Sequence, residues 1–167
     1  MVAVVLLVAI VVVLAAILFI LVERDLGSTN SLPTLGSALA LSSPVFAYGK
    51  ASGIGACAAA GCNFYNMTVQ SATSGLQLHD LIFEVISGNG TLFVPKGGVV
   101  VLNAAGAVVA QYAFTPETWT SGGTTAGQND LTIVLYTSGA TPQSLSGDTL
   151  RVVGVATYSG SIVVHFA

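Results

Sequence analysis

The feature of this sequence that most constrains its folding is an uninterrupted apolar run at the N-terminus. Residues 1–22 read MVAVVLLVAIVVVLAAILFILV and contain no charge, proline or glycine. As an α-helix they would extend about 33 Å, which matches a hydrocarbon core of about 30 Å. Such a helix is apolar on every side, so lipid or other helices would have to surround it. Three charged residues at 23–25 and then Gly27 end the run, and we predict a helix over residues 1–27.

This segment has three interpretations. A secretory signal peptide would have a basic stretch before a shorter apolar core, and this run has neither property. A plain single-pass anchor that holds an external domain remains open. The interpretation we favour is an assembly helix, which is held in the membrane first and then packs against identical helices in a filament core. The run begins at residue 1, as expected of a chain whose leader has been removed.

The composition also points to a covered surface. Apolar residues make up 53% of the chain and charged residues 7%, whereas a soluble domain has about 25% charged residues. An isolated monomer of this kind would be poorly solvated, so a bilayer, neighbouring copies or glycans are expected to cover it. Only four residues are Lys or Arg, too few for the basic footprint that nucleic-acid binding requires.

The remainder of the chain has a β pattern. Residues 28–43 are rich in Ser, Thr, Leu and Gly and predict a linker, and residues 44–167 predict a β-rich domain. The predicted strands are Asn63–Thr73, Leu78–Ser87, Gly98–Asn103, Ala107–Phe114, Asp130–Thr137, Thr149–Ala156 and Ser161–Phe166. Short strands separated by Gly-rich turns are typical of a sandwich or a small barrel. The predicted fold class is therefore α+β: a long N-terminal apolar α-helix (1–27) followed by an all-β, immunoglobulin-like sandwich or small-barrel domain.

Two pairs of residues are candidates for covalent modification. Cys57 and Cys62 lie in a Gly-rich stretch that could close a tight loop, so we predict a disulfide, with two buried free thiols as the alternative. Asn66 and Asn89 each begin an N-glycosylation sequon, Asn-Met-Thr and Asn-Gly-Thr. A glycan at either position would add solvation to an external domain that has few charges.

The sequence offers no constellation for catalysis or metal binding. His79 and Asp80 lack a nucleophile placed by any motif, and nothing brings Glu84 and Glu117 together. A zinc site would need more ligands than the two cysteines and two isolated histidines supply. Trp119 and Tyr112 are interpreted as core or subunit-contact aromatics. We therefore expect no enzyme activity, no metal and no cofactor.

The order of apolar N-terminal helix, Ser/Thr-rich hinge and C-terminal β domain resembles the type IV pilin superfamily. The run VVLLVAIVVVLAAIL at Val4–Leu18 is similar to archaeal type IV pilins and, less closely, to archaellins. GDTLRVV at Gly147–Val153 is similar to the closing strands of archaeal pilin domains. Bacterial pilins have Glu at the fifth position, where this chain has Val5, so the resemblance is to the archaeal type.

The resemblance implies that the chain is a structural subunit of an extracellular, cell-surface filament used for adhesion. Subunits would wait in the membrane and then polymerise with identical copies, helices at the filament axis and β domains outside. The filament exterior could contact surfaces or host cells. The alternatives are an archaellin, which serves motility, and a membrane-tethered external binding module. The predicted filament-core residues are Val4, Leu7, Ile10, Val11, Leu14, Ile17, Leu18 and Leu21.

Overall fold

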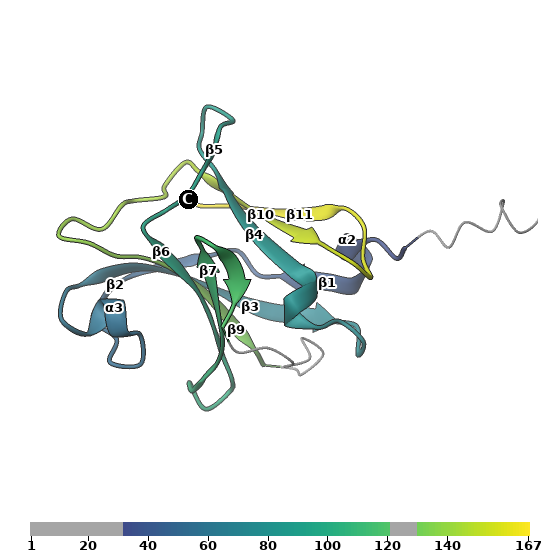
Figure 1. The fold of residues 1–167 in the computed structure, drawn as a ribbon, viewed down its shortest axis with the longest axis horizontal. Coiled ribbons are helices and arrows are strands. Elements are labelled where there is room, and N and C mark those ends of the chain that lie inside the picture. The colour runs from purple at the N-terminus through teal and green to yellow at the C-terminus, as the bar shows by residue number, and fades with distance from the viewer. Residues whose placement is uncertain (1–31, 121–129) are drawn as a thin grey trace, which may run out of the picture. The chain divides into compact units, whose positions relative to one another are not determined.

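The computed structural model describes residues 32–120 and 130–167 of the chain (Figure 1). The chain divides into two compact units, Met1–Leu32 and Pro33–Ala167. The second unit is a β domain, and its described part contains two antiparallel sheets. It also contains two four-residue helices, α2 (Leu35–Ala38) and α3 (Gly55–Ala58), and a 3₁₀ turn, η1 (Leu78–Asp80).

The larger sheet has seven strands in the described residues, ordered β1-β3-β9-β6-β7-β8, with β2 also paired to β3. Its strands are β1 (Leu39–Leu41), β2 (Val45–Gly49), β3 (Cys62–Ala72), β6 (Gly97–Leu102), β7 (Val108–Phe114), β8 (Glu117–Trp119) and β9 (Thr132–Thr137). The smaller sheet is ordered β11-β10-β4-β5. Its strands are β4 (Leu81–Ile86), β5 (Leu92–Phe93), β10 (Thr149–Gly154) and β11 (Ser161–His165).

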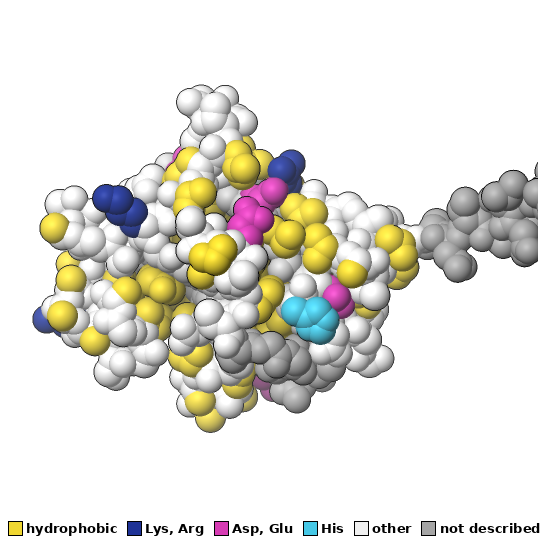
Figure 2. Space-filling view, in the orientation of Figure 1, with side chains coloured by type: hydrophobic (Ala, Val, Ile, Leu, Met, Phe, Trp, Pro, Cys, Tyr) yellow, Lys and Arg dark blue, Asp and Glu magenta, His cyan; other side chains and the backbone are white. Residues whose placement is uncertain are grey.

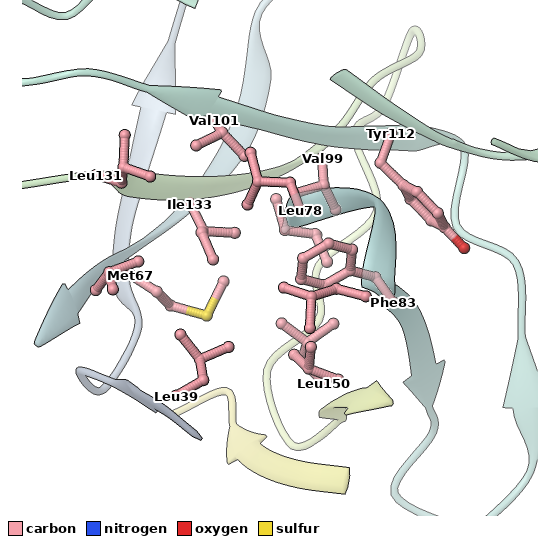
Figure 3. Packing of buried hydrophobic residues seen from close by; sticks show 14 of the residues in the cluster. Leu39, Met67, Leu78, Phe83, Val99, Val101, Tyr112, Leu131, Ile133 and Leu150 are labelled. Carbon is pink, nitrogen blue, oxygen red and sulfur yellow. The ribbon is translucent and has the colours of Figure 1, made fainter. Parts of the chain in front are cut away.

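The main core lies between the two sheets, which makes the domain a β-sandwich. Met67, Val99 and Ile133 of the larger sheet face Phe83 and Leu150 of the smaller one, and all five are buried (Figure 3). Alternation produces this arrangement, because successive side chains of a strand point to opposite faces. In β4, for example, the inward residues are buried and those between them are half-buried.

A second, smaller core covers the outer face of the larger sheet. It contains Ile54 and Cys57 from the segment around α3, together with Phe64, Val100 and Val134 from the strands beneath. This segment therefore closes part of a sheet face that would otherwise be exposed apolar surface.

The first residues of the domain are fastened to its C-terminal hairpin. Thr34 forms an isolated parallel bridge with Ser159. The Leu35 amide donates to the Ser159 carbonyl over 2.8 Å, and the Ser159 amide donates to the Pro33 carbonyl over 3.1 Å. We call this contact the terminal clamp. Leu35 is fully buried, so part of the segment predicted as a linker belongs to the folded domain.

The predicted fold class is contradicted by the structure. The described residues are mainly β-strand, and their helices span only four residues each. No helix within 32–120 and 130–167 is long and apolar enough to cross a membrane, so the prediction of a transmembrane, pilin-like helix is corrected. That prediction concerned residues 1–27, which lie outside the described residues. The predicted fold class was drawn from that one apolar run, whereas the longest helices of the described residues have four residues each.

Candidate assembly surface

The most unusual surface feature of the domain is its apolar edge strand, β2. This strand reads VFAYG between Pro44 and Lys50, and it pairs with β3 on one side. No other strand in the described part of the chain pairs with its opposite side. Its first four residues are exposed, and the three large side chains among them are exposed by 65% at Val45, 55% at Phe46 and 66% at Tyr48, with Val45 on the opposite face of the strand from the two aromatic rings. We call these three side chains the β2 patch.

The β2 patch is joined to the main core by stacked aromatic rings. Phe46 is opposite Tyr65 in the register, and their ring centroids lie 5.5 Å apart. Tyr65 in turn packs against Phe166 at 4.7 Å, and its hydroxyl accepts a hydrogen bond from the Leu145 amide over 2.7 Å. Because Tyr65 is buried and hydrogen-bonded, it gives Phe46 a fixed support beneath an exposed face.

The other end of the patch rests against the disulfide loop. Cys57 and Cys62 form a disulfide with their Cα atoms 5.5 Å apart, and both cysteines are fully buried. The Tyr48 hydroxyl lies only 2.3 Å from where a Cβ on Gly61 would stand. A side chain at that position would displace the tyrosine, so Gly61 lets the Tyr48 ring lie against the loop.

Charge is scarce around the β2 patch and across the domain. The described residues contain three basic and five acidic side chains, and the face drawn in Figure 2 shows few charged side chains among uncharged and hydrophobic atoms. Arg151 and Glu84, opposite each other on β10 and β4, form an ion pair. A surface of this kind cannot steer a charged ligand, and it favours contacts that bury apolar area.

The predicted site residues fall into separate places. Val4, Leu7, Ile10, Val11, Leu14, Ile17, Leu18 and Leu21 lie outside the described residues. Asn66 is half-buried in β3 between β2 and β9, whereas Asn89 is exposed in the turn between β4 and β5. The structure does not bring the two sequons together.

The residues considered for catalysis have structural partners. Asp80 is buried and accepts a hydrogen bond from the Thr157 hydroxyl over 3.0 Å, while His79 Nε2 lies 3.5 Å from its other oxygen. Glu84 is occupied by Arg151. Within the described segments, no group of three or more His, Cys, Asp or Glu side chains could hold a metal ion.

Tyr112 and Trp119 are both packed against Phe83, with ring centroids between 5.3 and 5.7 Å in this group of three. The Trp119 indole donates to the Leu81 carbonyl over 3.0 Å. The Tyr112 hydroxyl is buried without a hydrogen-bond partner. Burial, with a smaller contribution from Glu117, raises the pKa of Tyr112 to about 12. A backbone group at Phe83 lowers this pKa slightly but is not in hydrogen-bonding geometry.

Sequence reasoning did not find the β2 patch. The signal that could have found it is the run of β-favouring residues Val45–Tyr48 between a proline and a glycine, which is typical of a short strand. Its position at the sheet edge depends on which strand lies beside β3, and no local pattern contains that information.

Comparison of the chain with protein-family models, curated proteins and solved structures found no match. The resemblance to type IV pilins therefore remains a prediction from the sequence.

Proposed function

We propose that this chain is a structural subunit of an extracellular helical filament. Copies associate through the uncharged N-terminal segment 1–22 and through lateral contacts between β domains. The observation that carries the proposal is the β2 patch: three large apolar side chains exposed on an edge strand of a domain with few charges. Native proteins usually protect the edges of their sheets, so an exposed, apolar edge strand indicates a surface that associates with a partner.

One further feature supports an extracellular location, and a geometric argument accounts for a filament. The disulfide between Cys57 and Cys62 is typical of an oxidising compartment. A contact that joins different surfaces of two copies produces an open helical polymer when the rotation between the copies does not close into a ring.

The test compares two valine substitutions, Val45→Lys and Val163→Lys, in the full chain. Val45 is 65% exposed on β2, and Val163 is 52% exposed on β11, an outer strand of the smaller sheet. A lysine at Val45 would place a charge in the proposed contact, which is costly when no partner neutralises it. We expect Val45→Lys to abolish or strongly shorten filaments and Val163→Lys to leave them normal.

Electron microscopy of material sheared from cells, with mass-spectrometric identification of the subunit, gives the readout. Thermal unfolding of both variants serves as the control, because exposed substitutions should leave stability nearly unchanged. Filaments of normal length and yield from Val45→Lys would remove the β2 patch from the proposal. A wild-type chain recovered only as monomer, with no filaments under any condition, would overturn the proposal itself.

A further inference from the structure

The two N-glycosylation sequons are held in different local structures. The first, at Asn66, lies inside β3; the second, at Asn89, lies in the turn that joins β4 to β5. We propose that Asn89 carries an N-linked glycan and that Asn66 does not. The inference depends on the local geometry of the two sequons and rests on the extracellular location in the proposed function, but it stands whether or not the chain forms filaments.

The turn at Asn89 is fully accessible. Asn89 and its neighbours Gly88, Gly90 and Thr91 are all exposed, and the turn projects from the domain beyond β5 (Figure 1). Gly90 adopts a φ of +85°, and its amide donates to the Ser87 carbonyl over 2.8 Å. This tight hairpin geometry is available to glycine at little cost. A transferase can therefore reach Asn89 after the domain has folded.

In the second sequon, the hydroxyl of Thr91 contacts the side-chain amide of Asn89. The Asn89 Oδ1 atom accepts hydrogen bonds from the Thr91 hydroxyl over 2.7 Å and from the Thr91 amide over 3.1 Å. The Ser87 hydroxyl also donates to it. Within the described residues, Nδ2 of Asn89 donates no hydrogen bond, so the nitrogen that would be glycosylated is left free.

The sequon at Asn66 has the opposite arrangement. Asn66 is half-buried, with Val45 of β2 on one side and Val134 of β9 on the other. Its sequon hydroxyl, on Thr68, donates to the Ser42 side chain over 3.1 Å, and the Thr68 amide donates to the same oxygen over 2.9 Å. In an extended strand these groups cannot turn back toward Asn66, so the folded sequon does not fit a transferase.

The chemistry requires a sugar donor of a known class, a lipid-linked phosphate or pyrophosphate oligosaccharide. Nδ2 of Asn89 forms a bond to the anomeric carbon of the first sugar. The bond between that carbon and the phosphate oxygen breaks, and the lipid phosphate leaves with the electron pair. One proton from Nδ2 passes to a base of the transferase, so atoms and charge balance.

A glycan at this position would cover apolar surface. Leu92 is 58% exposed and Val94 is 59% exposed, and both follow the sequon closely in the chain. These two side chains lie on the smaller sheet side of the domain, separate from the β2 patch. Glycosylation would therefore solvate one exposed apolar region while leaving the proposed assembly surface bare.

The test uses the full chain secreted from a host that performs N-glycosylation. Intact-mass and glycopeptide mass spectrometry would be applied to the wild type, Asn89→Gln, Asn66→Gln and Thr91→Ser. We expect the entire glycan mass to be lost in Asn89→Gln and retained in Asn66→Gln. Thr91→Ser should keep the glycan, because serine also supplies the sequon hydroxyl.

Three outcomes would overturn the assignment. These are a wild-type chain with no glycan at Asn89, a glycan on Asn66, or an unchanged mass in Asn89→Gln. Unfolding temperatures of the secreted variants show whether each is folded. If Asn89→Gln fails to fold, Thr91→Ala replaces it, because it removes the second sequon while leaving Asn89 in place. If Asn66→Gln fails to fold, Thr68→Ala replaces it and removes the first sequon.

Discussion

At the scale of single residues, the least satisfied group of the described domain is the Tyr112 hydroxyl. Its ring packs well against Phe83 and Trp119, yet the oxygen is buried without a hydrogen-bond partner. Burying a polar group without a partner costs free energy that the hydroxyl would keep in water. The ring therefore stabilises the core while its oxygen opposes that stabilisation.

The substitution Tyr112→Phe should raise the free energy of unfolding by up to about 1 kcal/mol, because it removes only the unpaired oxygen. Chemical denaturation at neutral pH measures this change. Tyr48→Phe is the control, since the Tyr48 side chain is 66% exposed and its variant should unfold like the wild type. A loss of stability in Tyr112→Phe would mean that the hydroxyl has a partner.

Tyr112 also makes the stability of the folded domain depend on pH in the alkaline range. The pKa of Tyr112 is about 12 in the folded domain, against 10.0 for an unperturbed tyrosine, so the folded state holds its proton longer than the unfolded chain. This contribution to stability is complete below pH 10 and is lost as the pH rises toward 12. The stability of Tyr112→Phe should fall less steeply across that range, as denaturation at a series of pH values would measure. Part of the remaining fall in stability with pH would come from Tyr136, because burial also raises the pKa of that residue.

At the scale of elements, the joint between β6 and β9 depends on glycine. A Cβ at Gly97 would stand 1.8 Å from the Tyr136 carbonyl oxygen, a backbone atom that cannot move aside alone. A Cβ at the neighbouring Gly98 would stand 2.9 Å from the Tyr112 carbonyl oxygen of β7 and 3.1 Å from the Tyr136 hydroxyl. The two glycines that begin β6 therefore allow its close approach to β9 on one side and to β7 on the other.

Gly97→Ala should lower the free energy of unfolding by about 3 kcal/mol, since the strand must shift to accommodate the methyl group. Gly49→Ala is the matched control. Gly49 also lies in a strand, and nothing stands within 4 Å of its Cβ position. That variant should change stability by less than about 0.5 kcal/mol. Chemical denaturation of both variants provides the measurement, and equal effects would contradict the packing described at Gly97.

Strands with an alternating apolar pattern were predictable, and short edge strands were not. The alternation of β11 placed a strand at the corresponding residues because a half-buried strand imposes a period of two. β9 was also predicted, although both of its faces are buried, with Ile133 in the main core and Val134 in the second core. β2 and β8 were missed because only five and three residues form them, and both lie at an edge of the larger sheet. The β2 patch is exposed because β2 pairs with β3 alone, and the residues of β2 themselves do not show which strands will pair.

At the scale of the whole molecule, the described core is contained in the second unit of the chain. Every residue of the main core lies between Leu35 and Phe166, and the unit boundary falls between Leu32 and Pro33. The α+β prediction was wrong because it assigned the fold class from one apolar run. The described residues pack as a β-sandwich.

A chain that begins at Pro33 should therefore fold without residues 1–32 and should form no filaments. Cooperative thermal unfolding would show that it folds, and electron microscopy would show whether it assembles. The full-length chain is the control for assembly. An unfolded fragment would show that the core needs the first unit, and filaments of the fragment would show that segment 1–22 is dispensable for polymerisation.

The terminal clamp has a mechanical consequence. Any tension applied through the N-terminal segment enters the domain at Pro33 and reaches the two hydrogen bonds between Pro33, Leu35 and Ser159 first. These bonds join the start of the domain to the loop between its last two strands, so the load is shared by both ends of the chain. Behind them, β1 is hydrogen-bonded along β3 and Leu35 is buried. A pull on the segment must therefore shear a strand out of the larger sheet before the sandwich can open.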